Sequence, residues 1–89
     1  MQTTAAEVQH FIVDRIDDPL QAKGLGADDV PGSFDLLLEG VIDSFGIVEL
    51  ISALEERYGF EFDFDELAPD DLTRIGPLSS YVAQKLNGR

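Results

Sequence analysis

The chain has 89 residues and no cysteine, and eighteen Asp and Glu against six Lys and Arg give it a formal net charge of -12. Such a surface repels nucleic-acid phosphates and favours protein partners with basic docking patches. The lack of cysteine excludes disulfides and thiolate metal sites. With 44% hydrophobic residues, we expect a single, monomeric domain over residues 1–89. The sequence has no leader-like segment and no long apolar span, so we expect a cytoplasmic protein without a membrane span.

The first predicted element is an amphipathic helix over Thr4 to Asp17. Thr4 and Glu7 have the spacing of a capping box, and Asp18-Pro19 is expected to end the helix. The apolar stripe consists of Val8, Phe11, Ile12 and Ile16. His10, the only histidine, lies off this stripe and is assigned no role.

A long connection punctuated by glycine and proline follows, from Asp18 to Ile42. Connections of this length are unusual in compact domains, so we look for a hidden element inside it. The segment Ser33 to Glu39 is the candidate, as one short helical turn whose leucines pin the loop to the core.

The clearest helix runs from Ser44 to Tyr58. Steps of 100° per residue place one apolar stripe on its core face, made of Ile47, Leu50, Ile51, Leu54 and Tyr58. The opposite face carries Phe45, Val48 and Ser52, flanked by Glu49, Glu55 and Glu56. An exposed apolar strip rimmed by acids suits a partner groove with a basic rim, although single exposed apolar residues are also common.

The remainder predicts an extended linker and two further helices. Gly59 is placed to cap the preceding helix, and the rings that follow alternate with acids and are expected to be partly buried: Phe60, Phe62 and Phe64. A short third helix is expected after Asp63, with Leu67 and Phe64 facing inward. The last helix begins near Gly76-Pro77, ends at Asn87-Gly88, and has a stripe of Leu78, Tyr81, Val82 and Leu86.

The pair Asp43-Ser44 opens the clearest helix. Ser44 therefore lies where unpaired backbone N–H groups and the positive end of the helix dipole favour a phosphate. The simpler interpretation is that Asp43 or Ser44 is only an N-cap. The acids between Asp63 and Asp71 do not fit a calcium loop, and no hydrolase elbow or base accompanies a serine. We expect no metal and no catalytic residue.

Two stretches together resemble the acyl and peptidyl carrier proteins: residues 39–50, which contain Asp43-Ser44-Phe45, and residues 54–59, which begin Leu54-Glu55-Glu56. In that family an Asp-Ser followed by a bulky apolar residue opens the second helix. The resemblance continues weakly through residues 71–75. It implies an all-α, right-handed four-helix bundle of acyl-carrier type, with three principal helices, a short third helix and a long loop after the first.

The resemblance also implies a function. A separate phosphopantetheinyl transferase, using coenzyme A and magnesium, would attach 4'-phosphopantetheine to Ser44 beside Asp43. The thiol of that arm would hold acyl or aminoacyl groups as thioesters, supplied by a loading ligase and passed to downstream synthases or transferases. The recognition face would consist of Phe45, Val48, Glu49, Ser52, Glu55 and Glu56. The chain itself would not be an enzyme.

Three positions differ from housekeeping fatty-acid carriers, which usually have Leu, an acid and Met where this chain has Phe45, Gly46 and Ser52. A free-standing carrier for a specialised pathway, making a polyketide, a nonribosomal peptide or a related product, fits these residues best. The alternative is a non-covalent, acidic protein-protein interaction module that docks through the exposed face of residues 44–58, with Ser44 only a cap.

Overall fold

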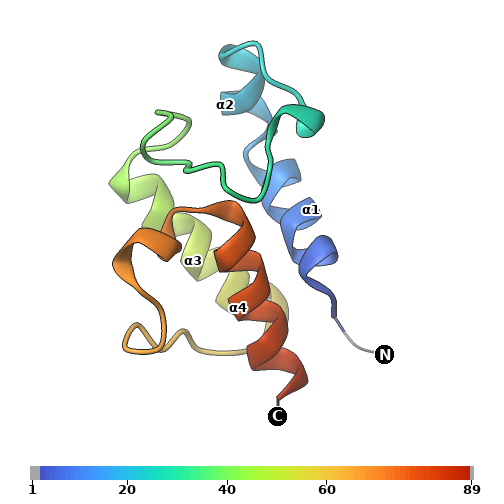
Figure 1. The fold of residues 1–89 in the computed structure, drawn as a ribbon, viewed down its shortest axis with the longest axis vertical. Helices are drawn as coiled ribbons and strands as arrows, with labels where there is room; N and C mark the ends of the chain where they lie inside the picture. Colours follow the sequence, from blue (N-terminus) through green and yellow to red (C-terminus); the bar gives the residue numbers. More distant parts are fainter. Residues whose placement is uncertain (1–2, 89) are drawn as a thin grey trace.

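The structure, a computed structural model, describes residues 3–88. These residues form an all-α arrangement without a β-strand (Figure 1). The α-helices are α1 (Ala5–Arg15), α2 (Asp17–Ala22), α3 (Ser44–Tyr58) and α4 (Ile75–Asn87), and two single turns of 3-10 helix are η1 (Ala27–Asp29) and η2 (Pro69–Leu72). The three principal helices predicted from the sequence are confirmed as α1, α3 and α4.

The first helix is capped as expected but ends earlier. Thr4 Oγ1 accepts a hydrogen bond from the Glu7 N–H at 3.1 Å. The helix breaks at Ile16, and α2 follows at once with Pro19 as its third residue. The prediction that Asp18-Pro19 stops the first helix is wrong, because α1 ends at Arg15, before this pair. Pro19 lies instead in the first turn of α2, where a proline removes only an N–H that has no intrahelical acceptor.

The expected turn within the long loop is present as a hydrogen-bonded turn over residues 35–40, in which the Glu39 N–H donates to the Asp35 carbonyl at 2.9 Å. Leu36 is fully buried. Leu37 and Leu38, however, are 40% and 81% exposed, so the prediction that all three leucines pin the loop is wrong. A single tight turn directs successive side chains in different directions, and only one of the three reaches the core.

Three backbone hydrogen bonds join this loop to the start of α4. The Leu36 N–H donates to the Thr73 carbonyl at 2.8 Å and the Ile75 N–H donates to the Phe34 carbonyl at 3.1 Å, which makes an isolated antiparallel bridge between Asp35 and Arg74. The Gly76 N–H donates to the Gly32 carbonyl at 2.8 Å. The loop that leads to α3 is therefore held at α4, far along the sequence.

The central helix agrees with its prediction at both ends. Gly59 has φ +68° and caps α3 in the left-handed conformation. The predicted core face is buried at Ile47, Leu50, Ile51 and Leu54, and Tyr58 is half-buried.

The predicted third helix after Asp63 is wrong. Residues 63–67 form a turn in which the Asp63 carboxylate accepts the Asp65 N–H at 3.0 Å, and the helical turn comes later, as η2. Phe60 and Phe62 are buried as expected, but Phe64 is 57% exposed instead of facing inward. An aspartate side chain that accepts the N–H two residues later forms a turn, and this turn competes with the start of a helix.

One hydrophobic cluster joins side chains of α1, α3 and α4. α1 packs along α4, and the Phe11 ring meets the Tyr58 ring edge-on at 5.8 Å between centroids. At the far end Asn87 Nδ2 donates to the Thr3 carbonyl at 2.8 Å. Within residues 3–88 no helix is both long and apolar enough to cross a bilayer.

Candidate functional site: the start of α3

The start of α3 presents a serine to solvent. Ser44 is the first residue of the helix and is exposed, and Asp43 is the N-cap in an extended conformation. The Asp43 carboxylate accepts the Gly46 N–H at 2.8 Å, and the Asp43 carbonyl accepts the Ile47 N–H at 3.0 Å. The first N–H groups of a helix have no intrahelical acceptor, and at the start of α3 this applies to the N–H groups of Ser44 and Phe45.

The start of α3 also needs a residue without a side chain at position 46. A Cβ on Gly46 would lie 2.9 Å from the Cβ of Ile42 and 3.4 Å from the Asp43 carboxylate. Gly46 therefore lets Ile42 pack against the first turn while Asp43 keeps its cap. The sequence marked Gly46 only as a difference from housekeeping fatty-acid carriers, because this contact depends on how the chain enters the helix.

Beside this terminus, α3 carries an open, shallow hollow, which we call the α3 hollow. Its lining consists of Arg15, Phe45, Val48, Glu49, Ser52, Ala53 and Glu56. Phe45 is 69% and Val48 is 60% exposed. Five of the six residues predicted to form a recognition face therefore surround one depression.

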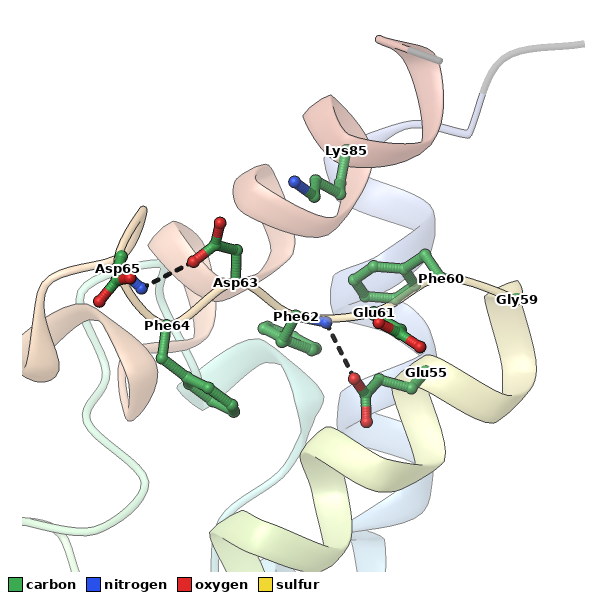
Figure 2. A pocket seen from close by; sticks show the side chains of 9 residues that line it. All are labelled: Glu55, Gly59, Phe60, Glu61, Phe62, Asp63, Phe64, Asp65 and Lys85. Carbon is green, nitrogen blue, oxygen red and sulfur yellow. Dashed lines mark hydrogen bonds between the residues drawn. The ribbon is translucent and has the colours of Figure 1, made fainter.

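Glu55, the sixth predicted residue, lies elsewhere. Its carboxylate accepts the Phe62 N–H at 2.9 Å and so holds the linker after α3 (Figure 2). On the helix Glu55 is about 80° from Ile47, on the flank of the core face, whereas Glu56 is about 180° from it. Arg15 was missed, since a residue of α1 reaches the α3 hollow only through tertiary packing.

No family model matches the chain, and no solved structure matches it. The site consists of an exposed hydroxyl at a capped helix start, next to a hollow with two exposed apolar side chains.

A second polar cluster fixes the linker to α4. Lys85 Nζ donates to the Glu66 carboxylate at 2.6 Å, and this hydrogen bond lowers the pKa of Glu66 and raises the pKa of Lys85. Tyr81 accepts the Asp63 N–H at 2.9 Å and donates to Glu66 at 3.1 Å, and burial raises the pKa of its hydroxyl. These bonds hold residues 63–66 in place.

Within residues 3–88, no three His, Asp or Glu side chains gather closely enough to hold a metal ion. His10 lies on the exposed side of α1, with its Nε2 3.4 Å from the Asp14 carboxylate.

Proposed function

We propose that this chain acts as an acyl or aminoacyl carrier, with 4'-phosphopantetheine attached through its phosphate to Ser44 Oγ. The observation that carries the proposal is the exposure of Ser44 at the first position of α3. A serine used only as a cap would precede the helix, and here Asp43 already fills that role.

The residues at this terminus fit a phosphodiester. The N–H groups of Ser44 and Phe45 and the positive end of the α3 dipole would stabilise its charge. The Asp43 carboxylate accepts a hydrogen bond from the Gly46 N–H at 2.8 Å. This hydrogen bond partly offsets the negative charge of Asp43 next to the phosphate. When bound, the arm would supply a terminal thiol that carries the acyl or aminoacyl cargo.

The α3 hollow would dock the enzymes that act on the arm. Phe45 and Val48 provide exposed apolar contact, and Glu49 and Glu56 provide a negative rim. These groups lie within about three turns of Ser44, so a docked enzyme would face the arm. The partners would be a phosphopantetheinyl transferase, a loading ligase and downstream synthases with basic patches, in a specialised biosynthetic pathway.

The decisive experiment is enzymatic modification of the purified chain. A broad-specificity phosphopantetheinyl transferase with coenzyme A and magnesium should add one phosphopantetheinyl group to the wild type, seen by intact mass. Ser44→Ala should remain unmodified, and Ser80→Ala, which removes another exposed helical serine, should react like the wild type. An unmodified wild type, beside a known carrier that reacts, would overturn the proposal.

The alternative is a non-covalent acidic module that docks through the same hollow, favoured by the exposure of Phe45 and Val48. In an assay of partner function, the carrier proposal predicts loss with Ser44→Ala and strong loss with Val48→Asp. The alternative predicts that Ser44→Ala keeps full function and that only Val48→Asp abolishes it.

A further inference from the structure

A second hollow, which we call the linker hollow, lies along residues 59–65 between the end of α3 and the last turns of α4 (Figure 2). Rings and acids alternate along its lining, at Phe60, Glu61, Phe62, Asp63, Phe64 and Asp65. It shares no lining residue with the α3 hollow. The two hollows are therefore separate surfaces.

The rings of the linker hollow form a fixed stack. Phe62 lies nearly parallel to Tyr81, with 5.3 Å between centroids and 24° between planes, and Phe64 lies nearly parallel to Phe62 at 6.1 Å and 16°. Phe62 is buried, whereas Phe64 is 57% exposed. Phe64 is thus the outermost ring of the stack, and more than half of its surface is exposed to solvent.

The charge of the linker hollow is negative. The only cation in its lining is Lys85, and Lys85 is already paired with Glu66. Glu55 is occupied by the Phe62 N–H. The exposed carboxylates of Glu61, Asp63 and Asp65 form no ion pair within residues 3–88, although the charge of Asp63 contributes to the raised pKa of Lys85.

We propose that the linker hollow docks an arginine-bearing segment of a partner protein, with one guanidinium on the exposed ring of Phe64 and neighbouring basic side chains facing the acids. A cation over an aromatic ring is attracted by the ring quadrupole, and the negative row favours a basic partner by charge complementarity. Arginine fits better than lysine, because its planar guanidinium stacks on rings and is more weakly hydrated than an ammonium. The same charge disfavours nucleic acid and anionic lipid.

This proposal does not rest on the carrier function, and its test uses the full chain carrying Ser44→Ala, which cannot be modified at that position. The 15N-labelled protein is titrated with acetyl-Arg-Leu-Arg-Leu-Arg-amide and with its lysine counterpart, and amide shifts are followed by NMR. We expect saturable shifts in residues 60–66 with the arginine peptide, and binding of the lysine peptide about threefold to fivefold weaker.

Variants separate the ring from the general charge. Phe64→Leu keeps an apolar side chain at an exposed position, so it should fold normally but lose the preference for arginine over lysine. Phe45→Leu, the matched change in the α3 hollow, should keep that preference. Equal affinity for the two peptides, shifts centred on the α3 hollow, or an arginine preference that survives in Phe64→Leu would each overturn the proposal.

Discussion

The backbone N–H of Gly76 donates to the carbonyl of Gly32 at 2.8 Å, and a Cβ at position 76 would stand 2.6 Å from that carbonyl oxygen. This contact joins the long loop to the first turn of α4. It lies next to the bridge between Asp35 and Arg74, so the loop that delivers the chain to Ser44 is aligned by α4.

Gly76→Ala should therefore destabilise the fold. In an unhindered helix this change stabilises by about 0.5–1 kcal/mol, but here the new methyl would push against backbone, and we expect a loss of about 1–3 kcal/mol. Urea unfolding measures the free energy. Gly32→Ala is the control, because its Cβ would lie at an ordinary 3.6 Å from the Cα of Gly76. A Gly76→Ala protein as stable as the wild type would contradict the close approach.

Local sequence patterns suffice to predict α3. The bounds of α3 follow from the Asp43 cap, the stripe around Leu50 and the Gly59 stop, which are all local signals, and the structure agrees at both ends. The helix predicted after Asp63 is absent because the spacing of Asp63 and Glu66 fits two local structures, a helix capping box and a turn closed by the aspartate side chain. The effect of Pro19 was predicted wrongly because it depends on where the proline lies in a helix. The sequence pattern did not show that a separate helix, α2, begins two residues before Pro19.

In the candidate site, too, some features follow from local sequence and others depend on tertiary packing. The exposure of Ser44, Phe45 and Val48 could be predicted, since it depends only on where α3 begins and which face is apolar. The engagement of Glu55 by the linker and the approach of Arg15 could not. Both depend on how separate segments pack, and helical periodicity carries no information about that packing.

The cap of α3 gives a second prediction. Asp43→Ala leaves the Gly46 N–H without its acceptor and should lower the free energy of unfolding by about 1 kcal/mol. Asp43→Asn keeps a side-chain oxygen at the cap and should stay within a few tenths of a kcal/mol of the wild type. Thermal and urea unfolding of the pair measure the difference, and equal losses in both variants would show that the charge of Asp43, and not its cap, stabilises the helix.

Asp35 should make stability depend on pH. Burial favours its neutral form, but hydrogen bonds from Leu38, Thr73 and Leu37, together with the charge of Arg74, outweigh burial and hold the pKa of Asp35 below its ordinary value. A lowered pKa contributes stability that is present above the unfolded value of about 3.9 and is lost as the pH falls through the folded value.

Asp35→Ala should therefore lower the free energy of unfolding by about 1–2 kcal/mol near pH 7. The difference in this free energy between the variant and the wild type should become smaller below about pH 4. Urea unfolding across this range measures the gap. Asp28→Asn is the control, because that exposed carboxylate makes no hydrogen bond within residues 3–88, and we expect a change of less than about 0.5 kcal/mol. A gap for Asp35→Ala that widened in acid would contradict the assignment.

Ser79 gives a prediction of the opposite sign. Its side chain is fully buried in α4, and its hydroxyl has no hydrogen-bond partner among residues 3–88. Ser79→Ala removes this buried polar group and improves helix propensity, so it should raise the free energy of unfolding by about 1 kcal/mol. Ser80→Ala changes the exposed neighbour and should raise the free energy of unfolding only by the difference in helix propensity. A smaller free energy of unfolding for Ser79→Ala than for Ser80→Ala would mean that the Ser79 hydroxyl has a hydrogen-bond partner in solution.

The net charge of -12 predicts that salt stabilises the fold. Within residues 3–88 the one ion pair of a carboxylate with a lysine or arginine is Lys85–Glu66, which leaves most acids unpaired. Raising NaCl from about 0.01 M to about 1 M shortens the Debye length from about 30 Å to about 3 Å and screens their repulsion. The Tm should therefore rise over this range, measured by circular dichroism.

A charge-reduced variant isolates the cause of this rise. Asp28→Asn combined with Glu39→Gln removes two exposed negative charges and should raise the Tm at low salt while making its dependence on NaCl shallower. If salt acted mainly by strengthening hydrophobic burial, the variant and the wild type would show parallel slopes. A flat or falling Tm in the wild type would show that self-repulsion does not limit the stability of this fold.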